Sequence, residues 1–219
     1  IVTVDDAIDV IEEEATEDIE KMAAIVPTEK SYFKAGVFDT FKSRIPWLML
    51  LMISATFTGA IISSFESKLT VFPALIAFIP MLMDTAGNCG SQSSVTVIRG
   101  ISLGDIKFKD IFRVLWKEIR VAVCCSVALA AVNFLKLWII DYMIFGNFDS
   151  GKQFAEIAVV CLTMMLTVIA AKIVGCVLPV LAKKIGFDPA VMASPFITTI
   201  VDAIALVIYF NFAVLMLGI

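Results

Sequence analysis

Long apolar runs recur along this chain and leave few folds open to it. An α-helix needs about 20 predominantly apolar residues to cross the hydrocarbon core of a membrane. Five segments meet this requirement, at residues 46–65, 69–98, 121–140, 157–181 and 191–217. Hydrophobic residues make up 60% of the 219 residues, whereas soluble domains average about 45–50%. The sequence therefore predicts an all-α membrane protein with five transmembrane helices per subunit.

The loops between these segments differ in positive charge. Lysine and arginine gather before the first segment, between the second and third, and at Lys183 and Lys184, whereas the other two loops hold one lysine each. Because cytoplasmic loops carry the excess of Lys and Arg, we expect a cytoplasmic N-terminus and an outside C-terminus. This topology predicts a multi-pass protein of the cell (inner, cytoplasmic) membrane.

Several functional classes are excluded or disfavoured by composition. The chain has no histidine, so imidazole metal ligands and Ser-His-Asp triads are excluded. No base, nucleophile or cofactor motif accompanies the acidic residues, so an enzyme is not expected. The five cysteines lie in apolar stretches without CxxC spacing and are interpreted as reduced packing residues. No basic run with interleaved aromatic residues indicates a nucleic-acid partner.

The first 45 residues differ from the rest of the chain. Residues 1–30 hold ten acids and two lysines, and a helix is expected from about Asp5 to Ala24. Residues 1–4 have the pattern of a strand without a partner, and a lone strand is not stable. We therefore expect residues 1–28 to be the remnant of a soluble cytoplasmic domain, with the chain cut inside or just after that domain.

Two amphipathic segments are expected at the inner membrane surface. Between Pro27 and Pro46, aromatic residues and lysines fall on opposite sides of a predicted short helix. Residues 29–45 are interpreted as an anchor at headgroup level or, alternatively, as a linker that transmits motion to the pore. Residues 103–116 are expected to lie along the same surface. Residues 46–219 then form the membrane domain.

Asp202 lies in the middle of the last apolar segment, where a charge costs about 2.5–3.5 kcal/mol. Its short side chain cannot reach water along a lipid-facing surface. Ser194, Thr198 and Asp202 are four residues apart and share one face of a helix. We expect this stripe to line a water-filled cavity and to bind a cation. The alternative is a buried carboxylate that is hydrogen-bonded between helices.

The second apolar segment contains a cluster of small and polar residues. Its members are Asp84, Thr85, Gly87, Asn88, Gly90 and Gln92. Pro80 and the two glycines permit a non-helical backbone, which at membrane depth is buried or lines a wet cavity. Exposed carbonyls and amides would then offer neutral oxygen ligands, with Asp84 as a second carboxylate. Close packing of helices at the glycines is the alternative.

Two lysines also lie within apolar segments. Lys136 is near the predicted outer end of its helix and can extend its ammonium group to the interface. Lys172 lies about ten residues from the inner end of its segment. It is expected to reach the interface in the same way, to pair with a carboxylate, or to tune an ion path.

Oxygen ligands without histidine or thiolate favour hard cations. Mg²⁺ keeps most of its waters and is typically bound through one or two carboxylates, which suits one Asp202 per chain. Five spans make a small bundle, so we expect a pore on the two-fold axis of a homodimer, where Asp202 from each subunit doubles the charge. The sequence does not separate Mg²⁺ from Mn²⁺, Co²⁺ or Ca²⁺.

These residues resemble motifs of the MgtE family of magnesium channels over essentially the whole chain. The matching strings are Pro80, Gly87-Asn88-Cys89-Gly90-Ser91-Gln92, Asp188-Pro189-Ala190, Ser194-Pro195-Phe196 and Asp202. Residues 1–28 look like the end of the family's second CBS domain, and residues 29–45 are similar to its connecting, or plug, helix. Asp84 and Lys172 depart from the family pattern, which has small or neutral polar residues there.

The resemblance implies a homodimeric, Mg²⁺-selective channel that conducts passively, with Asp202 binding a hydrated ion. Asn88, Gly87, Thr198, Gln92 and Asp84 are the further candidate ion-site residues. A secondary carrier, in which Asp202 would be a proton or Na⁺ coupling site, is the main alternative. A purely structural membrane subunit is the third interpretation.

Overall fold

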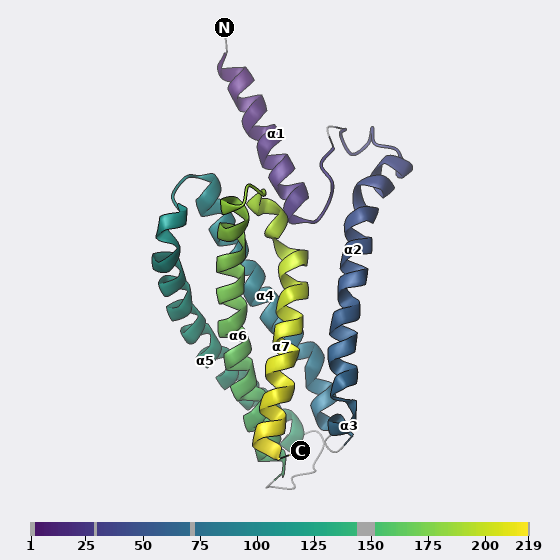
Figure 1. Ribbon diagram of the computed structural model, residues 1–219, viewed down its shortest axis with the longest axis vertical. Coiled ribbons are helices and arrows are strands. Elements are labelled where there is room, and N and C mark those ends of the chain that lie inside the picture. Colours follow the sequence, from purple (N-terminus) through teal and green to yellow (C-terminus); the bar gives the residue numbers. More distant parts are fainter. Residues whose placement is uncertain (1–2, 29, 71–72, 144–151, 219) are drawn as a thin grey trace.

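The computed structural model describes residues 3–28, 30–70, 73–143 and 152–218, and the regular elements in these ranges are all helices (Figure 1). The prediction of an all-α protein is therefore confirmed. The elements are α1 (Val4–Met22), α2 (Val37–Ser64), α3 (Glu66–Leu69), α4 (Ala74–Ser102), η1 (Phe108–Asp110), α5 (Ile111–Met143), α6 (Lys152–Lys184), η2 (Pro189–Met192) and α7 (Ser194–Leu217).

Four helical stretches are long and apolar enough to cross a membrane. They are Val37–Ser64, Phe108–Ile140, Phe154–Lys184 and Pro189–Leu217. The predicted second span corresponds to α4, which has 29 residues but is not among the four because polar side chains occupy its centre. A fifth crossing through α4 stays a prediction.

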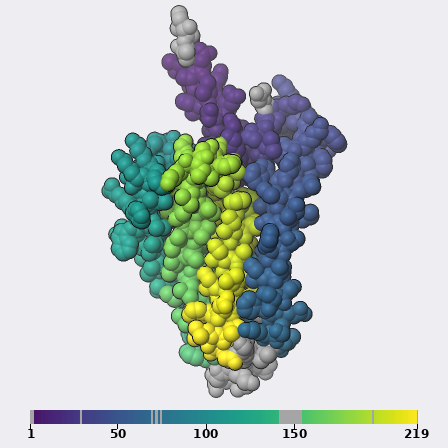
Figure 2. Space-filling view, viewed as in Figure 1, coloured from purple at the N-terminus to yellow at the C-terminus, as the bar shows by residue number. Residues whose placement is uncertain are grey.

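The bundle is built around α6, which packs against α4, α5 and α7, while α7 also contacts α4 and α2. Leu75, Leu82 and Tyr209 are among the largest fully buried side chains of this core. The Tyr209 hydroxyl donates a hydrogen bond of 2.8 Å to the Leu75 carbonyl, which ties α7 to the start of α4. In Figures 1 and 2, α2 lies along one side of the bundle and α1 projects from one end.

The backbone of α4 is an unbroken helix through Pro80, Gly87 and Gly90. The expected irregular backbone, with its exposed carbonyl ligands, is therefore wrong. Pro80 is tolerated, as prolines in membrane helices often are. Gly90 serves close packing instead, because a Cβ there would lie 2.9 Å from Ile197 Cγ2 and 3.2 Å from the Ala171 carbonyl oxygen. The alternative interpretation of this glycine as a packing residue is the correct one.

The N-terminal segment is more helical than the sequence predicts. Val4 is the first residue of α1 rather than part of a strand, while residues 1–2 lie outside the described residues. Thr3 caps the helix, since its hydroxyl accepts a hydrogen bond of 3.3 Å from the Asp6 amide. The Asp6 carboxylate accepts one of 2.7 Å from the Thr3 amide in return, and such a capping box fixes a helix start.

The two amphipathic segments do not form separate helices. The helix expected between Pro27 and Pro46 begins only at Val37 and continues through Pro46 to the end of α2. The segment 103–116 is likewise divided between a loop, the short η1 and the first residues of α5. In both places an apolar spanning helix follows without a break. Helix propagation from that spanning helix then outweighs the local boundary signals.

Candidate cation site

A cleft of about 450 Å³ lies between α4 and α7. Its lining residues are Ile79, Pro80, Met83, Asp84, Gly87, Asn88, Thr198 and Asp202. Asp84 and Asn88 are exposed while Asp202 is half-buried. The cleft therefore opens onto the surface of the subunit, and Asp202 lies on its inner side.

Helical spacing and one glycine bring these side chains together. Asp84 and Asn88 are one turn apart on α4, and Thr198 and Asp202 are one turn apart on α7. A Cβ at Gly87 would lie 3.1 Å from Thr198 Cγ2 and 3.6 Å from Asp202 Oδ1. Because Gly87 has no side chain, the α4 backbone and the Asp202 carboxylate approach each other closely.

Five of the six candidate residues predicted from the sequence thus line one cleft. The sixth, Gln92, does not line it but lies one turn beyond Asn88 on the same exposed face of α4. The Thr198 hydroxyl donates to the Pro195 carbonyl at 3.0 Å, which leaves its lone pairs available as acceptors. Ser194 begins α7, but its side chain lies outside the described part of the structure.

The two carboxylates of the cleft have no protein partner in the ranges that the structure covers. Neither Asp84 nor Asp202 forms a hydrogen bond or ion pair there. The alternative of an Asp202 carboxylate hydrogen-bonded between helices is thus not supported. Two unneutralised carboxylates in one cleft attract cations.

The kind of cation is limited by the small number of charged ligands. Among the described residues, no three His, Cys, Asp or Glu side chains come together as a metal site. A cation in this cleft would meet Asp202, Asp84 and the neutral oxygens of Asn88 and Thr198. It would therefore keep part of its hydration shell, as Mg²⁺ does when one or two carboxylates bind it.

A buried polar network behind the cleft includes a residue that sequence analysis missed. The Lys172 ammonium on α6 donates a hydrogen bond of 3.2 Å to the Ser93 hydroxyl on α4. Ser93 in turn donates one of 2.7 Å to the Glu118 carboxylate on α5, and all three residues are buried. The expected carboxylate partner of Lys172 is thus reached through a hydroxyl. Glu118 lies in a strongly basic segment, which favours a solvated surface position, so the sequence alone gave no signal of its burial.

We expect replacement of Glu118 by leucine to destabilise the bundle, because Lys172 would keep a buried charge without a counter-charge. Removing one partner of a buried ion pair in direct contact costs about 3–5 kcal/mol; because Ser93 separates the two charges here, we expect about 1–3 kcal/mol. The double variant Glu118→Leu/Lys172→Met removes both charges, so most of the loss should be recovered. Thermal unfolding of the detergent-solubilised protein measures both. Strictly additive losses in the double variant would contradict the coupling.

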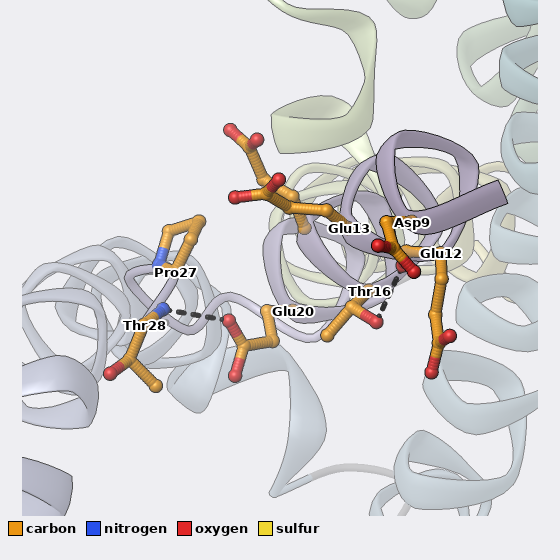
Figure 3. Close-up of a pocket in the computed structure, with 8 residues that line it drawn as sticks. Asp9, Glu12, Glu13, Thr16, Glu20, Pro27 and Thr28 are labelled. Atoms are coloured by element: carbon orange, nitrogen blue, oxygen red, sulfur yellow. Dashed lines mark hydrogen bonds between the residues drawn. The ribbon is translucent and has the colours of Figure 1, made fainter. Parts of the chain in front are cut away.

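The acidic helix α1 is attached to the bundle next to the start of α7. Lys21 pairs with Glu17 and, at 2.6 Å, with Asp188, which caps η2. These two hydrogen bonds raise the pKa of the Lys21 ammonium above its usual range. Asp9, Glu12 and Glu13 are exposed on α1 and line a surface pocket together with Glu20 (Figure 3), which accepts a hydrogen bond of 2.9 Å from the Thr28 amide.

Comparison with known proteins points to one family. The family model named MgtE and described as a divalent cation transporter matches residues 79–212, which include all the residues of the cleft. The "Magnesium transporter MgtE" of Thermus thermophilus is 34% identical over 217 residues, covering 99% of this chain and 46% of the relative. The protein of the same name from Bacillus subtilis is 37% identical over 217 residues, covering 97% and 45%.

A third similar protein, the "Magnesium transporter MgtE" of Enterococcus faecalis, is 34% identical over 213 residues, which cover 97% of this chain and 44% of the relative. The chain therefore spans less than half the length of these three curated relatives. Nearly all of the chain is matched in each case.

Proposed function

We propose that this chain, which belongs to the MgtE family of divalent cation transporters, forms a passive channel for Mg²⁺ across the cell membrane. The observation that carries this proposal is the cleft, where two carboxylates without a partner among the described residues lie beside neutral oxygen ligands near the centre of two long helices. Asp202 binds the hydrated ion, and Asp84, Asn88 and Thr198 contact its water shell.

A second copy of the chain completes the pore. Asp84, Asn88 and Gln92 are spaced by four residues and are exposed on one face of α4. Polar side chains facing lipid at mid-membrane are unfavourable, so such residues face protein or water. A two-fold homodimer that apposes these faces encloses the open side of the cleft and brings two Asp202 residues to one axis.

The proposed topology has five crossings, with α4 as the second. The chain termini lie at opposite ends of the bundle in Figure 1, as an odd number of crossings requires. Lys183 and Lys184 end α6 at the same end from which α1 projects. The excess of positive charge at this end supports a cytoplasmic location for it. Residues 1–28 and 29–45 would then connect cytoplasmic regulatory parts to the channel.

Membrane potential is sufficient to drive such a channel. One charge that crosses 100 mV gains about 2.3 kcal/mol, so a divalent ion gains about 4.6 kcal/mol. A coupled carrier would instead need a second ion gradient, with Asp202 as the coupling site.

Flux measurements distinguish these mechanisms. The chain is reconstituted into vesicles that contain a Mg²⁺ indicator, and a potassium diffusion potential is set with valinomycin. We expect Mg²⁺ entry to follow this potential in sodium-free buffer, and to continue after a protonophore removes the proton-motive force. Loss of entry under the protonophore would favour the carrier. A folded protein without any flux would favour a structural subunit.

A further inference from the structure

A second cavity, of about 340 Å³, lies at the end of the bundle from which α1 projects, away from the cation cleft. Its lining residues are Ile101, Gly104, Ile106, Lys107, Phe108, Val180, Lys183 and Lys184. They come from the end of α4, the following loop with η1, and the end of α6. The cavity combines an apolar wall with three lysines, and neither the cation cleft nor the proposed transport uses any of these residues.

The apolar wall is shaped by the chain folding back on α4. The Ile106 amide donates a hydrogen bond of 2.9 Å to the Gly100 carbonyl. A Cβ at Gly100 would lie 2.5 Å from Ile106 Cδ1, so only glycine lets Ile106 pack this closely. Gly104, with φ of 76°, makes the left-handed turn between them. Ile106 then packs against the buried cluster around Val180, and this packing holds the wall in place.

In the described part of the chain the three lysines, Lys107, Lys183 and Lys184, are not paired with carboxylates. Lys183 also lines an adjacent pocket beside Asp18 and Asp188, however, and its charge acts on the Asp188 carboxylate. The Lys184 ammonium lies 4.3 Å from the centroid of the Phe108 ring, which holds it at the rim of the cavity. The Asp110 carboxylate accepts a hydrogen bond of 3.1 Å from the Lys107 backbone amide but does not line the cavity.

The position of the cavity corresponds to a membrane interface. The spanning helix α6 ends at Lys184, and the first turns of α5 expose Phe112 and Trp116. Exposed aromatic residues beside the end of a spanning helix are typical of headgroup depth. An apolar wall below the lysines would therefore face acyl chains, while the ammonium groups lie among headgroups.

We propose that this cavity binds an anionic phospholipid of the cytoplasmic leaflet, with its phosphate between the three lysines and an acyl chain along the Ile101, Ile106 and Val180 wall. Basic pockets between membrane helices on the cytoplasmic side suit such headgroups. The cavity complements such a lipid in two ways. The lysines at its rim match the charge of the phosphate, and the apolar surface beneath them matches the acyl chain. A free phosphate ion would use only the rim.

Native mass spectrometry of the detergent-solubilised chain tests the proposal, with phosphatidylglycerol and phosphatidylcholine as probes. We expect phosphatidylglycerol to bind, and the variant Lys107→Gln/Lys183→Gln/Lys184→Gln to weaken its binding at least about tenfold. The control variant Lys34→Gln/Lys109→Gln/Lys117→Gln removes three exposed lysines outside the cavity and should change binding less than about twofold. Equal weakening in both variants would overturn the site.

A soluble competitor distinguishes the contribution of the lysines to lipid binding from that of the apolar wall. Glycerol 3-phosphate carries the phosphate but no acyl chain, so we expect it to displace phosphatidylglycerol only at concentrations at least about a hundredfold higher. Equal potency of the two molecules would show that the lysines bind phosphate alone and would overturn the lipid proposal. Equal binding of phosphatidylcholine would overturn the role of the lysines.

Discussion

We expect Asp202→Asn to reduce Mg²⁺ flux through the reconstituted protein by about 10- to 100-fold. Hydrogen bonds to a charged group contribute about 1.5–3 kcal/mol, and each 1.4 kcal/mol is a factor of ten. Asparagine keeps the size of the side chain but loses the charge that holds the hydrated ion. Asp84, the other carboxylate of the cleft, lies on its exposed side whereas Asp202 is half-buried on its inner side, so we do not expect Asp84 to replace it. Flux into indicator-loaded vesicles at a fixed potential measures the effect.

The matched control for this variant is Asp105→Asn, which removes the same charge from an exposed loop outside the cleft. Its flux should equal that of the unchanged protein. Asp84→Asn should fall between the two, because Asp84 lines the cleft from its exposed side. Normal flux in a folded Asp202→Asn protein would contradict the assignment of the ion site.

Gly175 packs directly against the backbone of α4 and is the most crowded of the described glycines. A Cβ at Gly175 would lie 2.2 Å from the carbonyl oxygen of Gly90, so α4 and α6 would have to separate. We therefore expect Gly175→Ala to destabilise the protein by about 1–3 kcal/mol or more, as overpacking of well-packed cores does. The thermal unfolding midpoint in detergent measures this loss.

Gly59 provides the control, because nothing lies within 4 Å of a Cβ built there on α2. Alanine has a higher helix propensity than glycine by about 1 kcal/mol, so Gly59→Ala should be neutral or stabilising. Similar losses of stability in the two variants would mean that α4 and α6 do not pack as the structure has them.

The sequence predicted those features of the cleft that depend on residues close together in the chain. Asp84 and Asn88, like Thr198 and Asp202, are four residues apart, and helical periodicity alone places each pair on one face. That the two pairs meet depends on which helices pack together, which single-helix patterns do not specify. For the same reason, the spacing of Gly87 and Gly90 in the sequence was compatible both with close packing of helices and with an irregular backbone. Only the contact of Gly90 with α6 and α7, distant in sequence, distinguishes close packing from an irregular backbone.

Boundaries at the membrane surface were less predictable than the apolar runs. Pro46 is a local signal for a helix start, yet α2 continues through it from Val37. A helix already nucleated in the apolar run extends at low cost into an amphipathic neighbour. Glu118 was missed because its basic surroundings suggested a surface segment, whereas the fold buries it against Ser93.

Cysteine modification at Asn88 examines whether the polar face of α4 lines the ion path. The residue is replaced by cysteine after the five native cysteines are changed to alanine, in a background that still conducts. A cationic thiol reagent should then lower Mg²⁺ flux at least about tenfold, because it adds bulk and positive charge where the ion passes. The matched variant Asp105→Cys, exposed in the loop between α4 and η1, should be modified without loss of flux. Full modification at position 88, confirmed by mass, with unchanged flux would contradict a pore along this face.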